Sequence, residues 1–173
     1  VNIMQPQIKT KKQTFDIHVK NILTENVWCD GVRLNQVLLN LLSNATKYTP
    51  ERGSIQLSLS EEKSPKGENH IRVHIRVKDN GIGMSPDFLK KIYESYSRAD
   101  GVRVSKTQGT GLGMAITKYI VDAMEGTIDI QSEPDKGTEF FLTFDFEKAV
   151  VMEMNMVLPP WNMLVVDDDK LLC

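Results

Sequence analysis

Residues 33–50 read RLNQVLLNLLSNATKYTP, a pattern regular enough to organise the fold of the whole chain. The apolar residues recur three and four positions apart, which is the spacing of a helix with one buried face. Asp30 precedes the pattern as a candidate N-cap, and Pro50 and Gly53 follow it as helix-ending residues. We therefore predict a helix over residues 30–48 whose apolar side packs on the core.

Three polar residues of this helix fall beside its apolar face. Asn40, Asn44 and Lys47 follow one another at intervals of four and three, so they form one stripe. Two amide oxygens and a cation are suited to Mg²⁺ with its bound phosphates, because Mg²⁺ takes oxygen ligands and keeps phosphate oxygens in its shell. A solvated helix face would show the same residues, and the helix by itself leaves both interpretations open.

Alternating apolar residues predict strands before and after this helix. The expected strands are residues 15–19, 55–59, 71–77, 127–132 and 138–146. Ser85 and Pro86 begin a second helix expected to carry Phe88 through Tyr96, and a third runs from about residue 114 through Met124 and ends at Gly126. The order predicts an α+β fold, a two-layer α/β sandwich with a mixed, mostly antiparallel sheet covered on one face by about three helices.

Two glycine-rich segments follow strands or begin helices. DNGIGM at 79–84 places Asp79 at a strand end, where a carboxylate could accept a hydrogen bond from the amine of a base, although Asp-Asn-Gly is also a strong turn former. GTGLGMAI at 109–116 places glycines at a helix start, where unpaired N–H groups attract phosphate. Its spacing is G-x-G-x-G, which fits neither the dinucleotide-binding fingerprint nor the P-loop. Ordinary helix-start glycines remain the alternative.

The composition excludes several classes of protein. With 40% hydrophobic and 25% charged residues, the 173-residue chain is ordinary for a soluble globular protein. A net charge of −2 implies no general attraction to nucleic acid, and the two cysteines fit a reducing compartment. No run of about 18 apolar residues predicts a membrane span. We expect a cytoplasmic domain without direct membrane or nucleic-acid contact, and the anchoring of its parent protein stays open.

The motifs together resemble the catalytic ATP-binding domain of sensor histidine kinases. That domain belongs to a wider class that includes DNA gyrase, mismatch-repair ATPases and a class of heat-shock chaperones. Five segments look like the N, G1, F, G2 and G3 boxes of the family, in family order. They are residues 33–50, DNGIGM at 79–84, FLKKIYESYSRAD at 88–100, GTGLGMAI at 109–116 and GTEFFL at 137–142. The resemblance covers residues 10–147.

The resemblance implies ATP and Mg²⁺ as ligands. Asn44 would be the main Mg²⁺ ligand, with Asn40 beside it. Lys47 would touch phosphate, and Tyr48 would pack near the base. Arg98 lies where the family often has an arginine that reaches phosphate. On this reading the polar stripe of the first helix is one wall of a nucleotide site.

The glycine-rich segments take complementary roles in the resemblance. Asp79 would accept the adenine amine, with Thr138 supporting it through water, and Gly81 and Gly83 would let backbone approach the base and sugar. The phosphates would be framed at a helix N-terminus by Gly109, Gly111, Leu112 and Gly113.

The residue at position 40 distinguishes the members of the class that hydrolyse ATP from those that transfer its phosphate. Hydrolysing members place a glutamate there as the general base for water, and an asparagine cannot take a proton at neutral pH. We expect transfer of the γ-phosphate to a histidine on a separate helical dimerisation domain, whose sequence hallmark this chain does not contain. A regulatory nucleotide-binding module without kinase activity and a gyrase-class ATPase are the alternatives.

The last residues suggest a second domain. MLVVDDDKLLC at 163–173 resembles the first strand of a receiver domain, with Asp167 and Asp168 as the acidic pair at its end. We expect an ATP-binding domain over residues 1–148, a linker over 149–162 and the truncated start of a receiver over 163–173. The parent protein would then be a hybrid histidine kinase that works in a phosphorelay.

Overall fold

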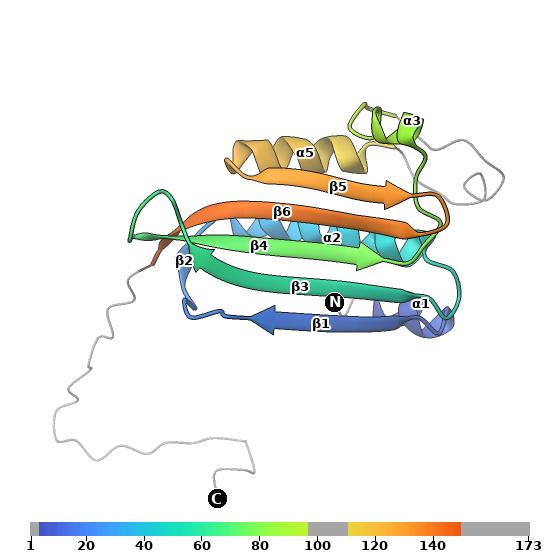
Figure 1. The fold of residues 1–173 in the computed structure, drawn as a ribbon, viewed down its shortest axis with the longest axis horizontal. Coiled ribbons are helices and arrows are strands. Elements are labelled where there is room, and N and C mark those ends of the chain that lie inside the picture. The colour runs from blue at the N-terminus through green and yellow to red at the C-terminus, as the bar shows by residue number, and fades with distance from the viewer. Residues whose placement is uncertain (1–3, 97–110, 150–173) are drawn as a thin grey trace, which may run out of the picture.

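The computed structural model describes residues 4–96 and 111–149. In chain order the elements are α1 Gln5–Thr10, β1 Thr14–Lys20, β2 Val27–Trp28, α2 Gly31–Tyr48, β3 Ser54–Lys63, β4 His70–Asp79, α3 Pro86–Leu89, α5 Gly113–Ala123, β5 Thr127–Glu133 and β6 Gly137–Lys148. The strands form one sheet, and α1, α2 and α5 lie on the same side of it (Figure 1). The predicted two-layer α+β sandwich is confirmed.

The six-stranded sheet is mixed and mostly antiparallel, as predicted. Its order is β1-β3-β4-β6, and both β5 and β2 pair with β6. Only the pair formed by β1 and β3 is parallel among the described strands. β6 pairs with three strands, β4, β5 and β2, and its register with β4 sets Thr138 directly opposite Asp79.

The core lies between the sheet and the helices. Alternate residues of β4 and β6 are buried against the helices, as period-two patterning requires. The core residues of these two strands and of α2 and α5 are Ile71, Val73, Ile75, Val77, Phe140, Leu142, Phe144, Phe146, Val37, Leu41, Leu42, Ala45, Ile120 and Val121. Because the apolar face of α2 is buried against the sheet, the direction in which its polar stripe of Asn40, Asn44 and Lys47 can face is fixed.

The ends of the long helices follow local rules, with one correction. Asp30 caps α2 as predicted, since its Oδ1 accepts from the backbone N–H of Arg33 at 3.0 Å. At the end of α5 the left-handed residue is Glu125, with φ 54°, and not Gly126. Gly126 donates its N–H to Val121 O at 2.9 Å, and a Cβ there would lie 2.5 Å from the Phe144 ring. Glycine is needed for close packing, while a glutamate makes the turn.

The predicted helix from Ser85 to Tyr96 is wrong in length. Ser85 caps α3 as expected, with its Oγ 3.2 Å from the N–H of Phe88, but α3 ends at Leu89. Tyr96 has φ 66°, and its N–H donates to Gly111 O at 3.1 Å, which no continuing helix allows. Short turns still bury Ile92, so the apolar period reflects burial without a helix.

Two elements have no strong signal in the sequence. α1 has six residues and β2 has two, and both are too short for a hydrophobic period to be recognised in the sequence.

The helices of the described part are all too short or too polar to span a membrane. The predicted linker and receiver segments fall almost wholly on residues 150–173, outside the described residues, and stay predictions.

Candidate functional site

The polar stripe of α2 faces the beginning of α5. Asn40 Nδ2 donates to Thr117 Oγ1 at 2.8 Å, and the Nδ2 atoms of Asn40 and Asn44 lie 3.8 and 3.7 Å from Met114 Sδ. A Cβ on Gly113 would lie 2.4 Å from Asn40 Oδ1, so a larger residue there would displace the Asn40 amide. Because the amide NH₂ groups are engaged with α5, the Oδ1 atoms are the groups left to meet a cation.

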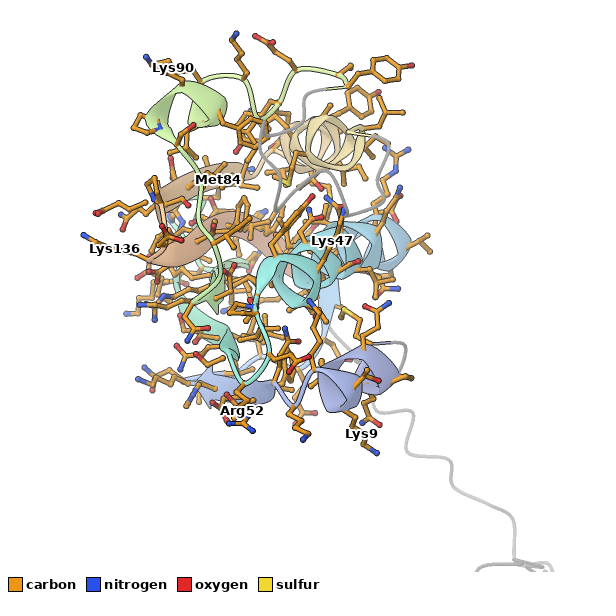
Figure 2. The ribbon with its side chains drawn as sticks, turned by 90° about the vertical axis from the view of Figure 1, so that its right-hand side faces the viewer. Lys9, Lys47, Arg52, Met84, Lys90 and Lys136 are labelled. Carbon is orange, nitrogen blue, oxygen red and sulfur yellow. The ribbon has the colours of Figure 1, made fainter. Side chains whose placement is uncertain are left out.

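The C-terminal turn of α2 is joined to the turn after β4. The N–H of Ile82 donates to Tyr48 O at 3.2 Å, and a Cβ on Gly81 would lie 2.7 Å from that oxygen. Lys47 Nζ lies 4.7 Å from the centroid of the Tyr48 ring. Figure 2 looks onto this end of the molecule, with Lys47 between α2 and α5 and Met84 on the segment that leads to α3.

Asp79 is a buried carboxylate at the end of β4. The residue is only 7% exposed, and its Oδ1 accepts from the N–H of Gly81 at 2.8 Å. Burial raises its pKa from 3.8 to about 6, while the backbone N–H groups of Gly81 and Thr138 act to lower it. A buried carboxylate held in this way is suited to accept a hydrogen bond from an incoming amine.

This raised pKa predicts a pH dependence of the ligand-free domain. The folded state holds the Asp79 proton more tightly than the unfolded state does. The resulting stabilisation is full below pH about 4 and is lost as pH rises through about 6. Urea unfolding of wild type and Asp79→Asn at pH 4 to 8 isolates the contribution of Asp79, because the other carboxylates contribute equally to the free energy of unfolding of both proteins. The free energy of unfolding of the variant minus that of wild type should grow by roughly 3 kcal/mol over this range. A constant difference would contradict the raised pKa.

The turn at 79–84 is held by the β5–β6 hairpin. Asp135 donates its N–H to Ile82 O at 2.8 Å, and Met84 donates its N–H to Ser132 Oγ at 2.9 Å. Gly83 has φ 61°, and a Cβ there would lie 1.9 Å from Glu133 O. Gly83 therefore serves a close backbone contact within the chain, and its approach to a nucleotide stays a prediction.

The second glycine-rich segment is described only from residue 111. Gly111 has φ 73°, Leu112 is the N-cap of α5, and Gly113 is its first residue opposite Asn40. Gly109 and Arg98 lie outside the described residues. Thr138 contacts Ser132, with the two hydroxyl oxygens 3.0 Å apart. The described members of the predicted set therefore come from three neighbouring places: the α2 end, the 79–84 turn with β6, and the start of α5.

Two contacts escaped the sequence analysis. Thr117 is 1% exposed and holds the Asn40 amide, and Ser132 links Met84 to the β6 start by donating to Gly137 O at 2.9 Å. The signal for Thr117 was a hydroxyl within the buried stripe of a helix, one turn after Gly113. The signal for Ser132 was indistinct, because Ser is common at the end of any strand before a turn.

Comparison with known proteins gives consistent sequence matches. The family described as "Histidine kinase-, DNA gyrase B-, and HSP90-like ATPase" matches residues 29–148. The autoinducer 2 sensor kinase/phosphatase LuxQ of Vibrio vulnificus is 38% identical over 159 residues, which is 92% of this chain and 18% of LuxQ. Sensor protein GacS of Pseudomonas syringae is 36% identical over 69% of this chain and 13% of GacS. The chain thus spans less than a fifth of either relative.

Solved structures share the fold. A crystal structure of full-length ShkA in complex with AMPPNP matches with a TM-score of 0.69 and 31% identity, over 86% of this chain and 28% of that one. The nucleotide-free catalytic domain of histidine kinase ThkA matches with a TM-score of 0.67 and 24% identity, over 83% of this chain and 87% of that domain.

Proposed function

Because the chain belongs to the family of histidine kinase-, DNA gyrase B- and HSP90-like ATPases, we propose that it supplies the γ-phosphate of ATP to a histidine. The chain is an ATP-binding catalytic domain homologous to those of sensor kinases. The acceptor would lie on a helical dimerisation domain of the parent protein. The observation that carries the proposal is the meeting of the Asn40–Asn44 stripe with the start of α5, while the turn after the buried Asp79 bonds to the end of α2 through Ile82 and Tyr48.

Each site residue that the structure describes would have a part in holding the nucleotide. The ionised Asp79 would accept from the adenine amine, with its other contacts supplied by the N–H groups of Gly81 and Thr138. Lys47 would pair with phosphate, while Tyr48 packs near the base. Gly111, Leu112 and Gly113 would present backbone N–H groups to the phosphates at the start of α5.

The donor set fits Mg²⁺. The NH₂ groups of Asn40 and Asn44 lie against Met114 and Thr117, which leaves two hard amide oxygens, and Mg²⁺ completes its shell with phosphate and water. Asn44 and Asn40 would hold the ion, which when bound would neutralise phosphate charge. Gly109 and Arg98 are proposed to complete the phosphate contacts.

Asn40 favours transfer over hydrolysis. A general base at this position would activate water, and an amide cannot. Phosphoryl transfer needs mainly positioning and charge stabilisation, so a positioned histidine would be the productive acceptor. We further propose that residues 163–173 begin a receiver domain, in which Asp167 and Asp168 form the acidic pair that helps hold Mg²⁺. That receiver domain would take the phosphate from the histidine in a phosphorelay.

The test mixes the chain with the helical domain of its parent protein and γ-labelled ATP. Acid-labile, base-stable phosphate on the helical domain supports the proposal. ATP binding without any transfer would favour a regulatory nucleotide-binding module. Rapid phosphate release by the chain alone would favour a gyrase-class ATPase.

Thr117 provides a prediction specific to the magnesium side of the site. Thr117→Val keeps the volume and removes the acceptor of Asn40 Nδ2, so the amide loses its fixed orientation. We expect affinity for ATP with Mg²⁺ to fall about fivefold to tenfold, and affinity in EDTA to change less. Titration calorimetry measures both, and Thr117→Ser, which keeps the hydroxyl, is the matched control. Equal losses of ATP affinity with and without Mg²⁺ would contradict the assignment of Thr117 to the magnesium side of the site.

A further inference from the structure

The end of α2 is capped by side chains from a distant part of the sequence. Lys11 Nζ donates to the backbone oxygens of Thr46, Lys47 and Thr49 at 2.9, 2.8 and 3.1 Å. Gln13 Nε2 donates to two of the same oxygens, those of Thr46 at 3.1 Å and Thr49 at 2.7 Å. Carbonyls at a helix C-terminus lack partners within the helix, so these two side chains satisfy the α2 end.

Lys11 and Gln13, which we call the α2 clamp, are chemically suited to hold the end of a helix. The C-terminal end of a helix carries partial negative charge, which a lysine ammonium offsets. Gln13 is buried, and its Oε1 has no hydrogen-bond partner among the described residues. Burying that oxygen costs free energy that an apolar side chain would avoid, so the amide is explained by what its NH₂ group holds.

The clamp is itself fixed to the core. α1 ends in a Schellman turn, in which Lys12 has φ 51° and the N–H of Gln13 donates to Ile8 O at 3.0 Å. Ile8 is buried in the core. The N–H of Arg52 donates to Lys11 O at 2.9 Å, which ties the turn after α2 to the same point. In Figure 2, Lys9 on α1 and Arg52 on that turn both lie at the lower end of the molecule.

The same turn of α2 carries the proposed nucleotide contacts on its other side. Lys47 and Tyr48 belong to it, Asn44 lies one turn earlier, and Tyr48 O holds the turn at 79–84 through Ile82. We propose that Lys11 and Gln13 are positioning residues for ATP: by capping α2 they set where Asn44 and Lys47 meet the phosphates. The inference rests on the proposed function, and it makes ATP affinity depend on how α1 sits on the core.

The test compares Lys11→Met and Gln13→Leu with Lys9→Met, which removes an exposed lysine from the same helix. NMR titrations with ATP and with adenosine, at a temperature where all variants are folded, separate phosphate contacts from base contacts. We expect Lys11→Met and Gln13→Leu each to weaken ATP about tenfold and adenosine no more than about twofold. Lys9→Met should match wild type for both ligands. A merely structural role would weaken both ligands together.

The outcomes separate this inference from the function beneath it. If wild type binds ATP and the Lys11 and Gln13 variants bind it equally well, the positioning role is overturned and the proposed function stands. Equal weakening of ATP and adenosine, or the same loss in Lys9→Met, also overturns it. A wild-type chain that binds no ATP overturns the proposed function, and this inference with it.

Discussion

Replacing Asp79 by asparagine should abolish measurable ATP binding while making the ligand-free domain more stable. Asp79 Oδ1 already accepts from the N–H of Gly81, so in the proposed function the second oxygen would accept from the adenine amine, beside the N–H of Thr138. In asparagine one of the two carboxylate oxygens is replaced by an NH₂ group. In one orientation of the amide this NH₂ would face the N–H of Gly81, and in the other it would face the adenine amine, so two hydrogen-bond donors would oppose each other in either case. We expect ATP affinity to fall at least about a hundredfold by titration calorimetry with Mg²⁺.

The stability effect of the same substitution has the opposite sign. At pH 7.5 the wild-type domain keeps a buried carboxylate ionised against its raised pKa, and the neutral amide removes that cost. The free energy of unfolding should rise by about 1–3 kcal/mol. Asp87→Asn is the matched control, because Asp87 is an exposed carboxylate paired with Lys90, and its loss should change little. Loss of binding together with loss of stability would contradict the assignment and indicate misfolding.

Replacing Gly137 by alanine should destabilise the domain by at least about 3 kcal/mol. Gly137 has φ 95°, and a Cβ there would lie 2.0 Å from Asp79 O and 2.7 Å from Asn80 Cα. Both contacts are to backbone, so relief requires β4 and β6 to separate where they hold Asp79 opposite Thr138. ATP affinity should fall as well, because the carboxylate moves with its backbone.

Gly67→Ala separates the two causes of this loss. Gly67 has φ 114°, equally unfavourable for a side chain, but nothing lies within 4 Å of the Cβ that would be added. The conformational cost alone is about 1–2 kcal/mol. Urea denaturation of both variants measures the difference, and equal losses would show that the contact with Asp79 is unimportant.

Local signals in the sequence predicted the elements that are long and regular. The α2 period and the Asp30 cap lie within 20 residues of one another, so they are legible without knowledge of the fold. The expected helix through Tyr96 failed because the N–H of Tyr96 bonds to Gly111, a partner that local propensity does not reveal. α1 and the capping role of Lys11 were missed for the same reason, since Lys11 bonds to oxygens 35 to 38 residues away.

The order and spacing of the five motifs, read from the sequence by itself, predicted an ATP-binding domain of the histidine kinase type, and the comparisons bear this out. Residue identity also determined that position 40 carries an amide and no general base. Only the tertiary structure decided that the Asn40 amide meets Thr117, that Asp79 lies opposite Thr138, and that Lys11 caps α2. The physical reason is that motifs record which chemical groups are present, whereas hydrogen bonding and burial across separate elements decide which atoms meet.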